Sequence, residues 1–215
     1  MFDTFLFRAH AHRLTGGFPG NPRLIDAWLA SNKAPADAAD QAAQQLAIRQ
    51  EFNPEDTHTT IFWRAPDGSP EYESRAMKAA IKEAANILGS TASRSGVLDV
   101  KNFRSKLAER VFVDPRIGGC PIICGCGETH QPGDILHLTE RPIQVMTMQG
   151  PRTSLKAVEY ATDVPLQFNI RILRDGIVKE THLRTILEYL QDGGLGADRS
   201  QGSGTFDLID FEQIA

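Results

Sequence analysis

The sequence predicts an α+β fold, in which strands and helices are mixed along the chain and not repeated as regular βα units. Residues 164–173 alternate apolar and polar side chains, as in a strand with one buried face. Residues 75–88 and 181–190 repeat apolar side chains at helical spacing. Long segments rich in Gly and Pro separate these elements, which argues against a regular doubly wound sheet.

The first half of the chain is expected to contain two strands and three helices. The strands are 2–14 and 59–65, and the helices are 24–29, 34–51 and 75–88. Gly89 is expected to end the last of these helices. The Ala- and Gln-rich segment has no strand pattern, so we interpret residues 30–60 as a helical insertion.

The second half is richer in strands. The expected strands are 111–115, 135–139, 143–148, 164–173 and 205–211. Thr181 is a plausible N-cap for the helix that follows residue 173. We therefore expect one domain over residues 1–215, with a second insertion over residues 116–137 that contains all three cysteines.

The composition is that of a soluble globular protein. Of 215 residues, 41% are hydrophobic and 23% are charged, and no apolar run is long enough to span a membrane. We expect a cytoplasmic location, because the first residues do not form a secretory signal. The formal charge is −4, but residues 75–116 contain nine Lys or Arg against four Asp or Glu. A nucleic-acid partner would have to bind this local patch, whose commoner alternative is a solvated helix face.

A glycine-rich loop follows the helix at 181–190 and opens the last strand. Its glycines are Gly194, Gly196, Gly202 and Gly204, and it also carries Arg199 and Ser200. Nucleotide-binding glycine loops follow a strand and open a helix, so both common nucleotide motifs are excluded by this order. The loop is either a helix cap with a turn, or a surface whose backbone N–H groups meet an anion.

This loop resembles the C-terminal glycine-rich loop of the RAMP superfamily, the RNA-binding proteins of CRISPR systems, and most closely that of the backbone subunits of CRISPR effector complexes. The resemblance rests on LGADRSQGSGTFDL after THLRTILEYLQDG, on the helix SRAMKAAIKEAANIL, and on ERPIQV and RTSLKAVEYATDVPLQFNIRIL. It covers roughly residues 68–89 and 138–211. Residues 30–60 have no counterpart in the family pattern.

The resemblance implies an RRM-like, ferredoxin-like antiparallel sheet with helices on one face. It also implies that the protein binds single-stranded RNA mainly through the RNA backbone and self-associates along it, as a homo-oligomer or within a larger ribonucleoprotein. Single-stranded DNA is a possible second ligand. A positive groove would serve this binding. The candidate residues are Arg75, Lys78, Lys82, Arg94, Lys101, Arg104 and Arg199, with Ser200 and the four loop glycines.

The cysteine cluster suggests a structural zinc site. Cys120, Cys124, Cys126 and His130 lie within eleven residues and provide the four soft or borderline ligands of a closed tetrahedral site. His137 is an alternative fourth ligand. The spacing departs from the usual Cys-x2-Cys, so reduced, partly buried thiols and a redox pair remain alternatives.

The sequence favours a protein that is not an enzyme, because it contains no recognisable hydrolase or metalloprotease motif. The weak catalytic candidates are His10 and His12, which share one face of the first strand, and Asp26. With them, the alternative function is an endoribonuclease. A third hypothesis is a phage-type structural or assembly protein that does not bind nucleic acid.

Overall fold

The computed structural model of the chain describes residues 1–19, 59–92, 100–127, 130, 135–147 and 150–214. Over these ranges it contains one large sheet, a second small sheet and three α-helices. The predicted α+β class is confirmed. Most of the insertion expected at 30–60 lies outside the described residues, as do Asp26 and Arg94.

Four strands of the large sheet have the order of a ferredoxin-like fold. β1 (Phe2–Thr15) lies between β10 (Phe206–Gln213) and β9 (Gly150–Leu173), and β6 (Val111–Asp114) pairs with the other edge of β9. All three pairings are antiparallel. The spatial order β10-β1-β9-β6 is that of a β-α-β-β-α-β unit, in which the fourth strand lies beside the first.

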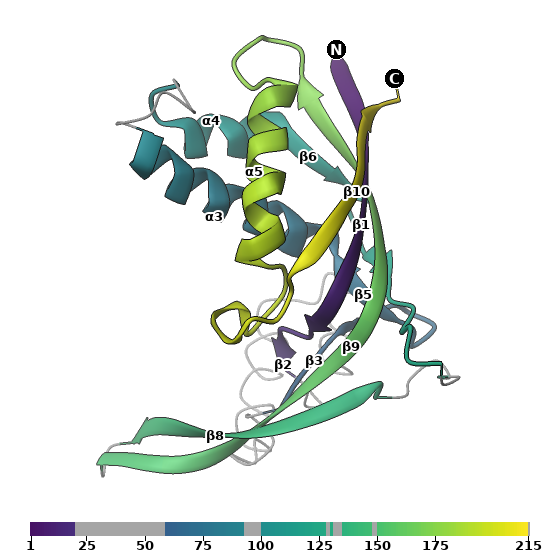
Figure 1. Ribbon diagram of the computed structural model, residues 1–215, viewed down its shortest axis with the longest axis vertical. Helices are drawn as coiled ribbons and strands as arrows, with labels where there is room; N and C mark the ends of the chain where they lie inside the picture. The colour runs from purple at the N-terminus through teal and green to yellow at the C-terminus, as the bar shows by residue number, and fades with distance from the viewer. Residues whose placement is uncertain (20–58, 93–99, 128–129, 131–134, 148–149, 215) are drawn as a thin grey trace, which may run out of the picture.

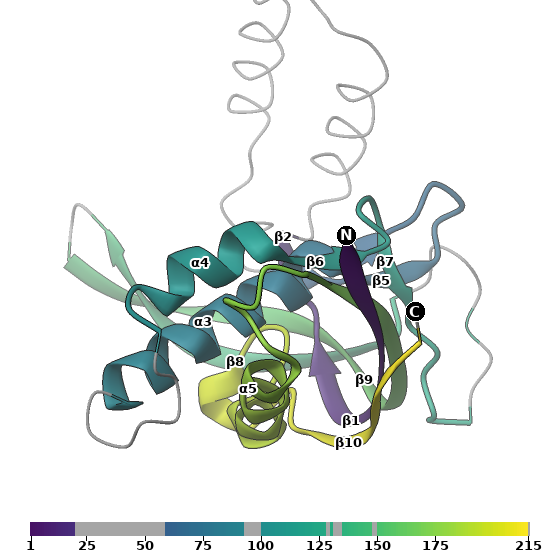
Figure 2. The same cartoon turned by 90° about the horizontal axis from the view of Figure 1, so that it is seen from above.

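The helices cover one face of this sheet. α3 (Ser74–Ala92) and α4 (Phe103–Arg110) lie between β1 and β6 in the chain, and α5 (Glu180–Gly193) connects β9 to β10. All three lie on the same side of the curved sheet (Figures 1 and 2). None of these helices is long and apolar enough to cross a membrane.

The core lies between the sheet and the helices. Phe7 of β1 and Phe168 of β9 are almost fully buried, and so are Leu183 and Leu187 of α5. The apolar side chains that alternate along residues 164–173 and those that repeat along residues 183–190 therefore pack in one core, as the sequence predicts.

The crossover from β1 to α3 adds short strands to both sheets. β2 (Phe18–Pro19) and β3 (Thr59–Ile61) extend the large sheet, whereas β4 (Trp63–Arg64), β5 (Pro70–Glu73) and β7 (Gly119–Pro121) form the small one. The strand predicted over 59–65 is therefore two strands in different sheets. The break occurs at Phe62, whose N–H donates to the buried side-chain carboxylate of Glu159 on β9.

A long hairpin arm extends from the sheet. β8 (His137–Thr147) pairs antiparallel with the first part of β9, from Gly150 to Tyr160, and projects away from the helices (Figure 1). The strands predicted at 135–139 and 143–148 are one strand. The pattern breaks at Pro142, which is tolerated because an edge strand does not need every N–H for pairing.

One helix was not predicted, and two predictions about helix ends are wrong. α4 was not expected, because only Phe103 and Leu107 of its eight residues are buried and so short a repeat is hard to recognise. α3 continues past Gly89 to Ala92, since one glycine within a helix costs only about 1 kcal/mol. The N-cap of α5 is Lys179 and not Thr181; the Nδ1 atom of His182 accepts the backbone N–H of Lys179.

Candidate metal centre and nucleic-acid interface

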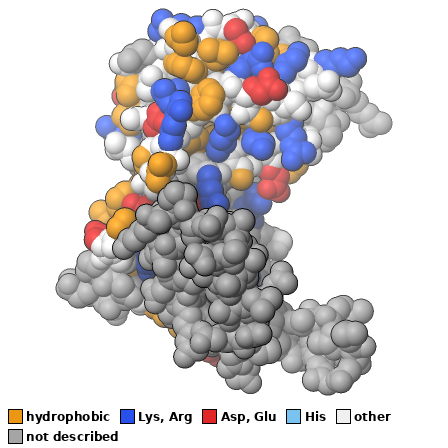
Figure 3. All heavy atoms as spheres, turned by 180° about the vertical axis from the view of Figure 1, so that it is seen from behind, with side chains coloured by type: hydrophobic (Ala, Val, Ile, Leu, Met, Phe, Trp, Pro, Cys, Tyr) orange, Lys and Arg blue, Asp and Glu red, His pale blue; other side chains and the backbone are white. Residues whose placement is uncertain are grey.

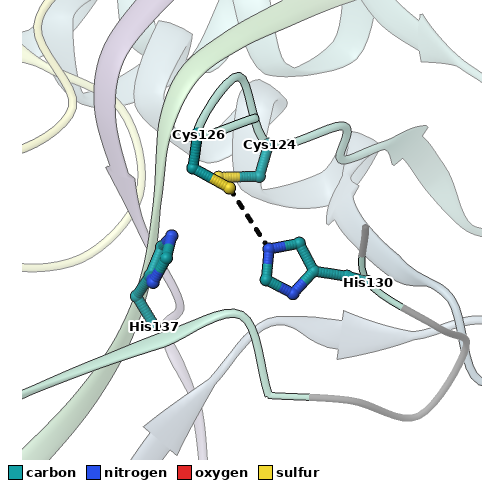
Figure 4. A group of neighbouring side chains, drawn as sticks. All are labelled: Cys124, Cys126, His130 and His137. Carbon is teal, nitrogen blue, oxygen red and sulfur yellow. Dashed lines mark hydrogen bonds between the residues drawn. The ribbon is translucent and has the colours of Figure 1, made fainter. Parts of the chain in front are cut away.

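Four potential metal ligands meet at the base of the hairpin arm (Figure 4). Cys124, Cys126, His130 and His137 each offer one ligand atom, and these atoms lie within 4.8 Å of one another. The Sγ atom of Cys126 is 3.3 Å from Nε2 of His130. In a tetrahedral zinc site, bond lengths of about 2.3 Å to sulfur and about 2.0 Å to nitrogen put these atoms about 3.5 Å apart. Donor types and spacing both fit a closed Cys2His2 zinc site.

This ligand set differs from the predicted one at one position. His130 and His137 are both in the cluster, and Cys120 is not. Cys120 lies in β7, where its side chain is buried against the core. Its Sγ atom accepts the backbone N–H of Gln167, and burial raises the pKa of the thiol despite this hydrogen bond.

The two cysteine ligands are held by a tight contact between their turn and β9. Gly125, which lies between them, donates its N–H to the carbonyl of Thr162 at 2.8 Å. A Cβ atom at this position would lie 2.6 Å from Cβ of Asp163. Only glycine permits this approach, so the Cys124 and Cys126 side chains start from a fixed backbone.

The Cys124 thiol is suited to bind a metal ion. Burial alone would raise its pKa, but hydrogen bonds from Thr162 and Cys126 outweigh that effect and lower the pKa to about 7. Because zinc binds the thiolate, a lower pKa reduces the cost of releasing the proton at neutral pH.

A buried carboxylate supports the other side of the cluster. Glu159 of β9 is fully buried, and its Oε1 atom accepts the backbone N–H of Leu136 at 2.9 Å and Nη2 of Arg64 at 2.6 Å. Oε2 accepts the N–H of Phe62 at 2.8 Å. Glu159 thus ties the residue before His137 to the strands of both sheets.

The glycine-rich loop is folded onto the end of β1. Its four predicted glycines all have φ between +75° and +85°, a region that disfavours other residues. A Cβ atom at Gly204 would lie 1.8 Å from the carbonyl oxygen of Leu195. The four N–H groups donate within the protein, from Gly194 to Leu190, from Gly196 to the Tyr72 hydroxyl, from Gly202 to Arg199 and from Gly204 to Arg13. These hydrogen bonds use the four glycine N–H groups within the fold, which favours the interpretation of the loop as a helix cap with a turn, while Arg199 and Ser200 are the side-chain binding candidates of the loop.

Arg199 reaches from the loop to α3. Its Nη2 atom is 2.7 Å from Oε2 of Glu83, so Asp198 is not its only acidic neighbour. Arg199 and Arg75 line the same cavity, between the loop and α3, although Arg75 is paired with Glu73 at 2.8 Å. The structure thus brings these two predicted cations together.

Lys78 lies on the other side of α3, beside β6. Its Nζ atom lies 4.8 Å from the centre of the Phe112 ring, and the guanidinium of Arg116 lies 5.4 Å from the same ring. Burial lowers the pKa of Lys78, and the positive charges of Lys82 and Arg116 lower it further. We define the cationic flank as Lys78, Lys82, Arg116 and Arg171, with the rings of Phe2 and Phe112. Its acidic partner is Asp114, which pairs with Arg171 at 2.5 Å and with Arg116 at 4.0 Å.

Two further predicted cations, Lys101 and Arg104, are exposed at the start of α4. Lys and Arg side chains gather on the face opposite that of Figure 1, in the half of the molecule that contains α4 and β6 (Figure 3). The predicted basic residues are therefore divided between two surfaces, one at the glycine loop and one at β6.

The two catalytic candidates on β1 each have an acidic partner. Nε2 of His10 is 3.5 Å from Asp163, and Nε2 of His12 is 3.6 Å from Asp207. Both histidines alternate with buried residues of β1, so they lie on the sheet face away from the helices. Asp26 is outside the described residues.

Phe112, Arg116, Arg171 and Tyr72 were not among the predicted site residues. A signal for Phe112 was present, because it lies between Val111 and Val113, which are both buried, and so must face outward. Arg171 alternates in the same way with Ile170 and Ile172. Pairing of β6 with β9, which brings these side chains together, is not visible in the sequence.

No protein-family model and no curated protein matches the chain. Among solved structures 72 chains match. One of them belongs to a cryo-EM structure of the type III-B Cmr-beta complex bound to cognate target RNA. Its sequence is 14% identical and its TM-score is 0.49. The match covers 99% of this chain and 61% of that chain, so this chain spans about three fifths of its length.

Proposed function

We propose that this protein binds single-stranded RNA, mainly through the RNA backbone, as a RAMP-type protein that self-associates along the strand. The observation that carries the proposal is the cationic flank. Three Lys or Arg side chains lie over two phenylalanine rings there, Lys82 adds a fourth positive charge, and one carboxylate lies among them, in a chain whose formal charge is −4. Positive charge along the phosphates and aromatic rings for the bases are what binding of a single strand requires.

The electrostatics of the flank support an anionic ligand. The pKa of Lys78 is lowered partly by Lys82 and Arg116, which means that these charges repel one another. A phosphate placed between them would relieve the repulsion and favour the charged lysine. Asp114 offsets only part of this charge, since it already pairs with Arg171.

We also propose that Cys124, Cys126, His130 and His137 bind zinc as a structural ion. Two thiolates and two imidazoles fill a tetrahedral shell and leave no position for a catalytic water. Cys124 and Cys126 lie in the turn that contacts β9, His130 lies in the segment that follows, and His137 is the first residue of β8. Zinc at this place would fix the cysteine turn to the base of the arm.

The RNA-binding proposal is tested by fluorescence anisotropy with a labelled 20-nucleotide RNA over a range of salt concentrations. Arg116→Glu should weaken binding about fivefold or more and reduce the slope of log K against log salt by about 0.7 for each phosphate that the variant no longer neutralises. Arg184→Glu is the matched control, because Arg184 is an exposed cation on α5, where it pairs with Glu180. No binding by the native protein at low salt would reject the proposal and favour a structural protein.

The same samples test for RNA cleavage, for a preference between RNA and DNA, and for self-association. The RNA should be recovered intact after incubation with the native protein. If the native protein shortens the RNA and the His10→Ala variant does not, the protein is an endoribonuclease. A DNA strand of the same sequence should bind more weakly, since the 2′-hydroxyl adds contacts that DNA lacks. The mass of the complex should rise with RNA length if copies assemble along the strand, and a constant mass would contradict self-association.

Elemental analysis of the purified protein tests the zinc proposal. We expect one zinc per chain in the native protein and in Cys120→Ala, because Cys120 is outside the cluster. Cys124→Ser and His137→Ala should both lose the metal. Retention of zinc by Cys124→Ser together with loss in Cys120→Ala would show that the ligand set is wrong.

A further inference from the structure

A cavity of about 330 Å³ lies between α3, β5 and the glycine-rich loop. Its walls include the small side chains of Ala76 and Ala79 from α3 and Ala197 from the loop, with Trp63 of β4 as an aromatic wall. This volume is at the lower end of the range of about 300–1,000 Å³ for small-molecule sites. Apolar and aromatic walls suit a planar ring.

Tyr72 contributes a buried hydrogen-bond donor to this cavity. The residue is only 4% exposed, and its hydroxyl oxygen accepts the N–H of Gly196 at 3.1 Å. The hydroxyl proton has no acceptor among the residues that the structure describes. Burial raises the pKa of Tyr72 to about 12, so the hydroxyl keeps its proton at neutral pH. A buried donor with no acceptor in the described part of the chain is a place where a ligand can supply one.

Two arginines flank the cavity. Arg75 pairs with Glu73 and Arg199 pairs with Glu83, and both arginine side chains are partly exposed, 70% for Arg75 and 31% for Arg199. A guanidinium has five N–H donors, so it can bind a phosphate oxygen while it keeps its carboxylate partner. Glu71, Glu73 and Glu83 also line the cavity, and two of them are the partners of these arginines, so the positive charge at its edge is partly neutralised. The free N–H donors of the two guanidiniums and the aromatic and apolar part of the interior match a nucleotide, with the base inside and the phosphates outside.

We propose that this cavity takes one unstacked base of the bound RNA, with the flanking phosphates held by Arg75 and Arg199. The proposal rests on the RNA-binding function proposed above and adds a base-binding pocket to it. The Tyr72 hydroxyl donates to a ring nitrogen or carbonyl oxygen of the base. All four bases present such an acceptor, so the pocket selects an unpaired and unstacked base and not a particular sequence.

The test uses a 12-nucleotide RNA of alternating uridine and 2-aminopurine, whose fluorescence falls when the fluorescent base stacks on an aromatic side chain. Native protein should quench it on binding. Ala79→Leu places a larger side chain at the exposed wall of the cavity and should abolish the quenching and weaken binding about fivefold or more. Asn86→Leu, an exposed position of α3 outside the cavity wall, is the matched control and should behave as the native protein.

The outcomes separate the two proposals. If Ala79→Leu binds and quenches like the native protein, base insertion is wrong while RNA binding stands. If both variants lose quenching equally, the signal comes from elsewhere and the pocket is again rejected. If the native protein does not bind this RNA at all, both the pocket and the proposed function fail.

Discussion

Replacing Glu159 with glutamine removes one negative charge from the interior and keeps the shape of the side chain. In the native protein the carboxylate accepts three hydrogen bonds, from Phe62, Arg64 and Leu136. The glutamine oxygen can still accept from Arg64 and Leu136, but its amide group then faces the N–H of Phe62, and two donors repel. Arg64, which is 8% exposed, loses its negatively charged partner.

The expected cost is about 3–5 kcal/mol, which is typical when one partner of a buried ion pair is removed. For a chain of this length, each kcal/mol lowers the melting temperature by about 2–4 °C, so the total shift is about 6–20 °C. Asp210→Asn is the matched control, because its pair with Arg8 is exposed and 3.9 Å long. It should cost less than about 1 kcal/mol.

The free energy of unfolding is measured in urea with a chelator present, so that metal binding does not contribute. A second arm uses Arg64→Met with Glu159→Gln. The double variant should lose less than the sum of the two single variants, because both charges of the buried ion pair are then removed together. A loss below about 1 kcal/mol for Glu159→Gln would refute the reasoning, since the ion pair would then contribute no more than an exposed one.

Three further predictions concern the loop and the core. Gly204→Ala should cost about 3 kcal/mol or more in urea unfolding, because its Cβ would meet the carbonyl of Leu195, whereas Gly202→Ala, with similar φ and open space, should cost about 1 kcal/mol. Leu187→Ala in the core should lower stability by about 2–5 kcal/mol, measured by thermal unfolding. Tyr72 should ionise at about pH 12 in an absorbance titration at high pH, and Tyr72→Phe should remove that step. Its pKa is raised on folding, so the stability it contributes is complete below about pH 10 and is lost as the pH rises through about 12.

The ferredoxin-like core could be predicted because its elements each have one buried face. Residues 164–173 alternate with period two, and Leu183, Leu187 and Leu190 form a helical stripe. Both patterns are local, so they can be recognised in the sequence without knowing which elements each one packs against. The first part of β9 could not be predicted in this way, since most of it pairs with β8 in an arm that projects away from the helices.

The site was harder to predict because its members come together only through folding. The spacing of Cys120, Cys124 and Cys126 does not show which of them faces the core, and pairing of β7 with β5 decides that for Cys120. His137 joins the cluster because β8 begins at that residue. The hydrogen bonds of the glycine N–H groups could not be predicted either, since their acceptors lie in α5, β1, β5 and the loop itself.

The arm and the core share a single strand, because β9 pairs with β1 in the core and with β8 in the arm. Within β9 the one described non-glycine residue with positive φ is Asp163, at +51°, where the cysteine turn also contacts the strand. Between Asp163 and Ala157 the strand is still paired with β1 and β3, and from Ala157 to Gly150 it spans seven residues, or about 23 Å at about 3.3 Å per residue. A bend of about 10° where this pairing ends would move the far end of the arm through about 4 Å. The pairing with β1 and β3 thus sets the direction in which the arm leaves the sheet, and an ion bound by the two cysteines and two histidines would brace the first residue of β8 at the base of the arm.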